Sequence, residues 1–233
     1  MSCAVYLGLR RLSIAYRLSD QCGMERYFAT SKNQRFSTEQ IRVKYTMSKK
    51  KVSGIGFVGS DGTGKTTLLS ALRAELGSSV IVVDEVARSV IESGFPLGKN
   101  ASRESYIELS RRYQEKLYVA LQAGGLLISE RTALDPLAYA LVNTRLPRPH
   151  IDRYFIDFLK AQWRLDSLNY VTYFYFPIEF DMVADGVRVN DQSYRDDVSQ
   201  TMLQLTEESL PRVAHMTGTV GERLNSALSI IQG

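Results

Sequence analysis

One glycine-rich stretch contains residues whose types and spacing suit phosphate binding. The run Gly59-Ser60-Asp61-Gly62-Thr63-Gly64-Lys65-Thr66 fits the pattern G-x-x-x-x-G-K-[ST] in full, and Thr67 follows it. Glycines at this spacing let backbone N–H groups turn toward phosphates, and a helix that starts here adds partial positive charge. We expect Lys65 to reach the β- and γ-phosphates of a nucleotide, and the Thr66 hydroxyl to bind Mg²⁺. The sequence therefore predicts a nucleotide site at residues 59–67.

Glu130 and Arg131, in the stretch ISERTALDPLAYA, form a second candidate group. A carboxylate at the end of a strand can hold Mg²⁺ through water or accept a proton. An adjacent guanidinium can bind an acceptor or the migrating phosphoryl group through two hydrogen bonds. The same pair can also be a buried ion pair without chemistry, and the two residues alone leave both interpretations open.

A third candidate group follows the apolar run SVIVVDE. Asp84 or Glu85 could act as the general base on an acceptor hydroxyl, and we favour Asp84 because it ends the run. Arg88 lies one helical turn further and could bind an acceptor phosphate. The alternative for this segment is a capping acid with an i,i+4 ion pair.

Two other nucleotide-binding classes fit the sequence less well. A GTPase would need an Asn-Lys-x-Asp motif for guanine, and the sequence has none. The run VIVVDE resembles the Walker B strand of a motor ATPase, but Asp84 follows Lys65 by only 19 residues. That spacing leaves room for one helix and one turn, so we interpret the run as the second strand of the fold.

Two arginines, Arg188 and Arg195, stand seven residues apart in VADGVRVNDQSYRDDV. They are candidates for a lid that closes over the phosphates, excludes water and neutralises charge that develops during transfer. The alternative is a solvated helix start with ordinary ion pairs.

The elements that must position these residues alternate between strands and helices. Apolar runs predict strands at 52–59, 79–85, 126–129, 170–176 and 212–218, and helical spacing of apolar residues predicts helices at 65–77, 101–125, 150–163 and 221–232. Such alternation predicts a parallel sheet covered on both faces. The candidate acids then gather at the carboxyl ends of the strands, at the edge where the glycine-rich loop opens.

Charge separates an N-terminal leader from the domain. Residues 1–51 hold 11 Lys and Arg against three acidic residues, and the remainder holds 18 basic and 22 acidic residues. We expect residues 1–46 to be a basic leader or an upstream start, without folded structure, and residues 47–233 to form the domain. A transit peptide would make the protein organellar; otherwise we expect it in the cytoplasm. The core charge does not support DNA binding, and no apolar run is long enough for a membrane span.

From about Val52 to the C-terminus, these motifs resemble the thymidylate kinase and deoxynucleoside kinase superfamily. Thymidylate kinases carry an acid before Gly-x-Gly-Lys-[ST]-Thr, and a strand ending Asp-Arg followed by Ala-Tyr-Gln. Here Glu130-Arg131 precedes Ala138-Tyr139 at the same spacing, and deoxynucleoside kinases use Glu-Arg-Ser. The resemblance implies an α/β, three-layer P-loop kinase fold with a parallel five-stranded sheet and an Arg-bearing lid. It also implies acceptor contacts from Arg131 and Tyr139, and a metal site at Thr66 and Glu130.

The acceptor half of the resemblance is rebuilt. Ala140 stands where thymidylate kinases have the nucleobase-side Gln, and the Arg-x-Pro element after the second strand is missing. The replacement, DEVARSVIESGFP, and the later ADGVR look more like ribosylnicotinamide kinase domains.

The combined interpretation is an ATP-dependent kinase that uses MgATP as donor. Three acceptors stay open: a deoxynucleoside monophosphate, a nucleoside such as ribosylnicotinamide, and 5-hydroxymethyluridine in DNA, the substrate of viral relatives. A P-loop protein that signals its nucleotide state to a partner is the alternative from another class. The chain could also form a homodimer.

Overall fold

The computed structural model describes part of the chain and divides it into two units. The described residues are 7–9, 12–18, 24–29, 53–84, 86–146, 151–181, 191–210 and 212–232. The first compact unit is Met1–Lys49 and the second is Lys50–Gly233, and each is described by itself. Every candidate site residue named above belongs to the second unit.

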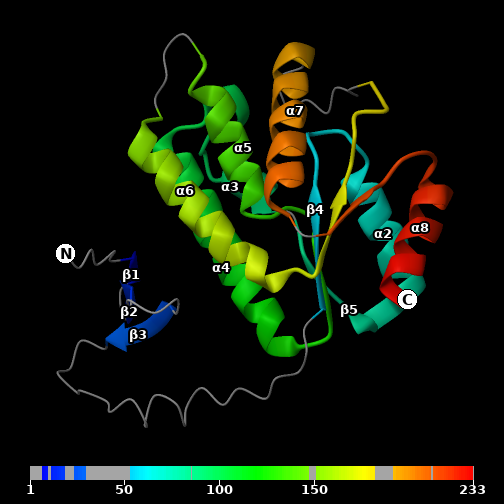
Figure 1. The fold of residues 1–233 in the computed structure, drawn as a ribbon, viewed down its shortest axis with the longest axis horizontal. Helices are drawn as coiled ribbons and strands as arrows, with labels where there is room; N and C mark the ends of the chain where they lie inside the picture. Colours follow the sequence, from blue (N-terminus) through cyan, green and yellow to red (C-terminus); the bar gives the residue numbers. More distant parts are fainter. Residues whose placement is uncertain are drawn as a thin grey trace. The chain divides into compact units, whose positions relative to one another are not determined.

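A five-stranded parallel sheet forms the centre of the second unit (Figure 1), with the strand order β5-β6-β4-β7-β8. The strands are β4 (Ser53–Val58), β5 (Val80–Val83), β6 (Leu126–Ser129), β7 (Thr172–Tyr175) and β8 (Val213–His215). Adjacent strands pair in parallel throughout. The predicted parallel sheet is therefore confirmed, and β4 delivers the glycine-rich loop to the middle of its carboxyl edge.

Helices cover both faces of this sheet, so the unit has three layers (Figure 1). The helices are α2 (Lys65–Leu76), α3 (Val86–Glu92), α4 (Arg103–Ala123), α5 (Leu134–Asn143), α6 (Arg153–Asp166), α7 (Gln192–Ser209) and α8 (Val220–Gln232), with 3-10 turns η1 (Gly77–Ser79), η2 (Gly98–Asn100) and η3 (Ser167–Asn169). Alternate residues of the strands face opposite layers. Ile55 and Phe57 of β4 pack with α2 and α8, whereas Val58 packs with the cluster formed by α4 to α7.

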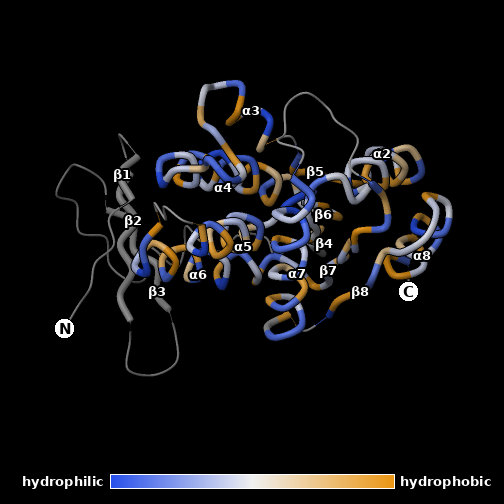
Figure 2. Tube along the Cα trace, turned by 90° about the horizontal axis from the view of Figure 1, so that it is seen from above, coloured by the Kyte–Doolittle hydropathy of each residue, from blue (hydrophilic) through white to orange (hydrophobic). Residues whose placement is uncertain are grey.

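Burial on both faces explains why the strands are continuous apolar runs. All four residues of β7 are buried, and Leu127 and Ile128 of β6 are buried in opposite clusters. Hydrophobic segments gather around the sheet, while hydrophilic segments alternate with them along α4 and α7 (Figure 2). Three helices, α3, α5 and α7, are not among those expected from periodicity.

The first unit contains three short strands, β1 (Leu7–Leu9), β2 (Leu12–Leu18) and β3 (Met24–Ala29), which pair antiparallel in this order. The expectation that residues 1–46 are a basic leader or an upstream start stays a prediction. The run from Leu12 to Leu18 alternates apolar residues with small or polar ones, a period of two that favours a strand. Whether residues 1–46 are cleaved, or lie before the true start, stays a prediction.

Within the described residues, the helices are too short or too polar to cross a membrane.

Candidate functional site

The glycine-rich loop joins β4 to α2 in the way phosphate binding requires. Gly64 precedes α2 with φ of 88°, in the left-handed region that favours glycine, and a Cβ there would lie 2.9 Å from the Arg223 guanidinium. Lys65 is 4% exposed, and its ammonium donates to the Gly59 and Ser60 carbonyls at 2.6 Å each. Burial lowers the pKa of Lys65 to about 8, and nearby Arg131 contributes to the same shift.

The loop also contains polar groups that suit a triphosphate. The Ser60 hydroxyl is buried and has no hydrogen-bond partner among the described residues. The Lys65 ammonium donates to backbone carbonyls. Phosphate oxygens are stronger hydrogen-bond acceptors for a charged donor and can take the place of these carbonyls. The exposed side chains of Thr66 and Thr67 line the adjoining cavity. These residues therefore fit the nucleotide that the motif predicts.

Thr66 and Glu130 form the candidate metal site. The Thr66 hydroxyl donates to the Glu130 carboxylate, and both residues line the same cavity. In the described parts of the chain, no group of three or more His, Cys, Asp or Glu residues could hold a metal. Mg²⁺ binds through few carboxylates and completes its octahedron with water and substrate phosphates. This pair suits Mg²⁺ held jointly with a nucleotide.

The first of two cavities, which we call the P-loop cavity, has a volume of about 370 Å³. Its walls are the loop, Glu130, Arg131, Phe180 and Arg223. Arg223 comes from α8 and is 2% exposed; its guanidinium donates to the Thr63 carbonyl at 2.7 Å and to the Glu179 carboxylate at 2.6 Å. The C-terminal helix thus holds the loop from behind.

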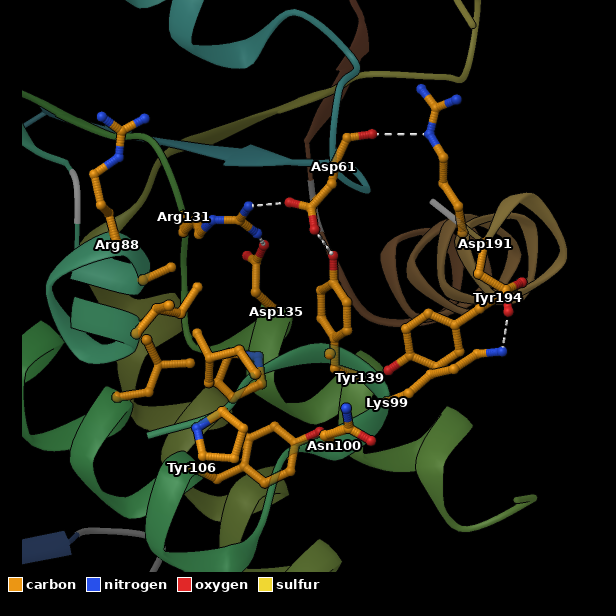
Figure 3. Close-up of a pocket in the computed structure, with 18 residues that line it drawn as sticks. Asp61, Arg88, Lys99, Asn100, Tyr106, Arg131, Asp135, Tyr139, Asp191 and Tyr194 are labelled. Atoms are coloured by element: carbon orange, nitrogen blue, oxygen red, sulfur yellow. Dashed lines mark hydrogen bonds and ion pairs between the residues drawn. The ribbon is translucent and has the colours of Figure 1, made fainter. Parts of the chain in front are cut away.

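The second cavity, of about 340 Å³, includes Asp61 of the loop in its lining (Figure 3). We call it the tyrosine-lined cavity because Tyr106, Tyr139 and Tyr194 form its wall. Apolar side chains, among them Ile91, Leu97 and Pro136, line it as well. Among the described residues, Asp61 and Arg131 alone line both cavities. They occupy the place where contents of the two cavities would meet.

Asp61 and Arg131 form an ion pair at this meeting point. The Tyr139 hydroxyl donates to the other Asp61 oxygen at 3.0 Å, and Arg131 also pairs with Asp135 at 2.9 Å (Figure 3). Desolvation opposes the charge on Arg131, but the carboxylates of Asp61 and Asp135 hold the pKa of Arg131 well above its usual value. Burial raises the pKa of Asp135 despite the nearby Arg131. The arginine is therefore charged and fixed in place.

Polar contacts fix the far wall of the tyrosine-lined cavity. Lys99 of η2 forms an ion pair with Asp191, which also caps α7 by accepting the Tyr194 N–H. Asn143 of α5 donates to the Tyr106 hydroxyl and to a backbone carbonyl in η2, and accepts from the Tyr194 hydroxyl at 2.8 Å. These contacts join η2, α5 and α7 around the cavity.

The structure brings most of the predicted residues together but sets Asp84 apart. The Asp84 carboxylate pairs with Arg73 of α2 at 3.0 Å, and its backbone carbonyl accepts from Lys116. Asp84 lines neither cavity, because β5 lies at the edge of the sheet and β6, which ends before Glu130, lies beside β4. Arg88 is exposed and lines the tyrosine-lined cavity. Glu85 lies outside the described residues.

The two lid candidates have different outcomes. Arg188 lies outside the described residues. Arg195, on α7, is 4% exposed, and its guanidinium donates to the carbonyls of Asp61, Gly62 and Phe180. It contacts the backbone of the loop rather than reaching over it. These contacts suit a residue that holds the loop in shape, and the lid role of Arg195 stays a prediction.

Several site residues are not anticipated from the sequence. Asp135 has a visible signal, since it follows Arg131 by four residues, the spacing of a helical ion pair. For Asp61, the motif predicts a contact with the nucleotide alone. Arg223 and the Lys99–Asp191 pair join segments far apart in the chain, and nothing local marks them.

Comparisons with known proteins agree with this fold. A search of curated protein sequences finds no match. The NadR protein in complex with NR superposes with a TM-score of 0.57 at 19% identity, over 78% of this chain and 51% of that one. The chain thus spans about half the length of NadR. Deoxyadenosine kinase from M. mycoides gives 0.58 at 14% identity over 77% and 98%, and thymidylate kinase from Candida albicans gives 0.56 at 17% over 78% and 91%.

These likenesses are those of an α/β P-loop kinase fold, as the motifs predicted. At the sequence level, residues 55–223 match the family model AAA_28, described as an AAA domain. That match covers most of the second unit, including the glycine-rich loop, both cavities and Arg223. The chain therefore belongs to this AAA domain family.

Proposed function

We propose that this protein is an ATP-dependent kinase that transfers the γ-phosphoryl group of MgATP to a hydroxyl of a nucleoside-type acceptor. The observation that carries the proposal is the pair of cavities that share Asp61 and Arg131. A protein that only binds or hydrolyses a nucleotide needs one cavity beside the loop. Two cavities that meet at a carboxylate and a guanidinium suit a donor and an acceptor.

The P-loop cavity is the donor site in this proposal. Lys65 and the loop amides bind the β- and γ-phosphates, and Thr66 with Glu130 holds Mg²⁺. The metal, when bound, neutralises negative charge on the phosphates. Arg131 stands beside both cavities and stabilises the charge that develops on the phosphoryl group in transit.

The tyrosine-lined cavity is the acceptor site, and Asp61 is the group that faces the acceptor hydroxyl. The hydroxyl oxygen bonds to the γ-phosphorus, the bond from that phosphorus to the bridging oxygen of ADP breaks, and the hydroxyl proton passes to the Asp61 carboxylate. Tyr139 and Arg131 hold this carboxylate by hydrogen bonds, so it is oriented before the acceptor arrives. The base predicted at Asp84 is therefore reassigned to Asp61.

The charges around the acceptor cavity favour an uncharged acceptor. Arg131 pairs with two carboxylates, Lys99 pairs with Asp191, and Arg195 is bound to backbone carbonyls. A phosphate bound by any of these three cations would have to displace a partner that the cation already has. Nucleosides and their relatives present hydroxyls and an aromatic ring, which suit the three tyrosines. The neighbours with NR bound and with deoxyadenosine kinase activity in their names are consistent with this choice.

A nucleoside monophosphate is the second candidate, and one observation favours it. Arg88 is an exposed cation on α3 that lines the acceptor cavity. Its guanidinium could bind a phosphate at the cavity mouth. A hydroxylated base in DNA stays the third possibility, although the core carries no excess of positive charge to hold a DNA backbone.

The test is transfer of label from γ-³²P-ATP to a panel of ribonucleosides, deoxynucleosides, ribosylnicotinamide, their monophosphates and hydroxymethyluracil-containing DNA. We expect labelled product with at least one nucleoside, and ATP turnover that depends on that acceptor. Label on monophosphates alone would favour the Arg88 candidate. ATP hydrolysis at the same rate with and without every acceptor would contradict a kinase and favour a nucleotide-dependent switch.

A further inference from the structure

A buried carboxylate lies behind the loop that carries Glu130 and Arg131, and the proposed transfer does not use it. Asp166 is the last residue of α6 and is 2% exposed. One of its oxygens accepts the backbone N–H of Ala133 at 2.8 Å, and the other accepts the Tyr113 hydroxyl at 3.0 Å. Ala133 is the residue just before α5, so Asp166 holds the end of the loop 130–133.

Other contacts hold the same loop residue by residue. The Glu130 N–H donates to the Val83 carbonyl at 2.9 Å, and the Ser129 hydroxyl donates to the Arg131 carbonyl at 2.6 Å. Asp135 accepts the Thr132 N–H at 3.0 Å and the Arg131 guanidinium at 2.9 Å. Asp135 thus holds the loop from its own helix, whereas Asp166 holds it from α6.

Two glycines of β4 allow this close arrangement. A Cβ on Gly56 would lie 2.7 Å from the Thr132 side chain and 2.9 Å from the Tyr173 ring. A Cβ on Gly54 would lie 2.0 Å from the carbonyl of Asn169, in the turn that follows Asp166. Since any side chain at either position would clash, the glycines let the loop and the end of α6 lie directly against the central strand.

The surroundings of Asp166 disfavour a charged carboxylate. Tyr113 of α4 and Tyr170 before β7 bond to each other beside it, Tyr173 of β7 has a buried hydroxyl with no partner among the described residues, and Asp135 of α5 adds a like charge. Burial raises the pKa of Asp166 to about 7. An apolar residue would avoid this desolvation penalty, so the hydrogen bonds that the Asp166 oxygens accept are what an acid adds at this position.

We propose that Asp166 is a positioning residue for the Glu130–Arg131 loop: its carboxylate fixes the Ala133 end of the loop so that Glu130 stays at Thr66 and Arg131 stays at Asp61. The effect of Asp166 on catalysis rests on the proposed function. The effect of Asp166 on the position of residues 130–133 does not, because it can be measured in the protein without any substrate.

The experiment compares Asp166→Ala with Asp166→Asn, which keeps the shape and one oxygen acceptor. Asp157→Ala, an exposed acid on the same helix, is the matched control. For each variant, hydrogen–deuterium exchange is measured over residues 129–135, together with kcat, the KM for ATP and the melting temperature. We expect Asp166→Ala to speed exchange in that segment and to lower kcat by about 10- to 100-fold, with the KM for ATP changed less than about twofold. Asp166→Asn should restore most of kcat, and Asp157→Ala should match the wild type.

Two results would overturn the proposal. One is unchanged exchange over 129–135 in folded Asp166→Ala; the other is a loss of kcat and ATP affinity together that Asp166→Asn does not restore. If Asp166→Ala fails to fold, Tyr113→Phe, which removes the hydroxyl that orients Asp166, must give the same exchange and the same split between kcat and KM. If the wild type phosphorylates no acceptor, the proposed function fails, and the exchange result alone decides whether Asp166 positions the loop.

Discussion

The carboxylate of Asp61 and the guanidinium of Arg131 form an ion pair where the P-loop cavity meets the tyrosine-lined cavity. Asp61 comes from the phosphate-binding loop and Arg131 from the segment after β6. The pair therefore connects the phosphate-binding loop to the segment after β6, which also contains Glu130, the proposed metal ligand. Changes at either residue should affect transfer more than nucleotide binding.

Asp61→Asn should lower the transfer rate by about 10²–10⁴-fold, because the amide keeps the shape of the carboxylate but cannot accept the hydroxyl proton. The affinity for ATP should change little, since the loop amides and Lys65 are intact. Asp84→Asn is the matched control and should be nearly silent, because Asp84 lines neither cavity. The measurement is the transfer rate of each variant with the preferred acceptor. A large loss of rate in Asp84→Asn together with a small loss in Asp61→Asn would contradict our assignment of the base to Asp61.

Lys65→Ala should reduce transfer by at least about 10²-fold, since it removes the buried cation that the proposed function places at the β- and γ-phosphates. The fold should survive, because the short hydrogen bonds of Lys65 go to carbonyls of the loop itself. Circular dichroism and single-turnover rates measure the two effects. Unchanged turnover in this variant would remove the donor assignment.

Arg195→Ala should raise the KM for ATP and lower the melting temperature, in contrast to the effect on kcat alone that a lid arginine would give. The guanidinium holds three carbonyls, and leaving a buried polar group unpaired costs about 1–3 kcal/mol. Arg88→Ala, at an exposed cation on α3, is the comparison and should leave the melting temperature unchanged. A normal KM with a low kcat in Arg195→Ala would support the lid interpretation instead.

Asp191→Asn should raise the KM for the acceptor severalfold and leave the KM for ATP unchanged. The substitution removes the ion pair with Lys99 at the wall of the acceptor cavity but keeps the cap of α7, because Asn is also a good capping residue. Stability should fall little, since the pair is partly exposed. Equal changes in both KM values would indicate that α7 itself had moved.

Stability should depend on pH through Asp166. Its pKa is raised by burial from 3.8 to about 7, so the folded protein binds this proton more tightly than the unfolded chain. The stabilising contribution is then complete below about pH 4 and is lost as the pH rises through 7. The melting temperature of the wild type should fall relative to that of Asp166→Asn between pH 4 and pH 7, and the difference should level off above. Parallel curves for the two proteins would contradict the shifted pKa.

The donor side of the site could be predicted from the sequence because it is local. Loop, lysine and threonine follow one another between a strand and a helix, and burial of β4, β6 and β7 on both faces leaves a continuous apolar signal. Helix α7 has no such signal. Its buried residues include the polar Arg195, Ser199 and Thr206 beside the apolar Val198 and Met202, and these polar residues interrupt the apolar period.

The side proposed for the acceptor depends on strand order, which a single sequence does not reveal. Asp84 ends a buried run, as a strand-end base would, but β5 is an edge strand and its acid turns to Arg73. The wall of the tyrosine-lined cavity includes residues of α3, α4, α5, α7 and η2, and contacts such as that of Lys99 with Asp191 join these elements across long stretches of chain. Asp166 likewise contacts Ala133, and helices α5 and α6 lie between these two residues in the chain.

The most direct test of the central claim is the affinity of a bisubstrate compound, adenosine joined through a polyphosphate to the nucleoside that the panel identifies. If the two cavities are donor and acceptor sites that meet at Asp61 and Arg131, one molecule can occupy both. Calorimetry should then show binding at least about 10²-fold tighter than that of ATP, and Asp191→Asn should reduce this gain without changing ATP binding. Affinity equal to that of ATP, unaffected by Asp191→Asn, would contradict the account.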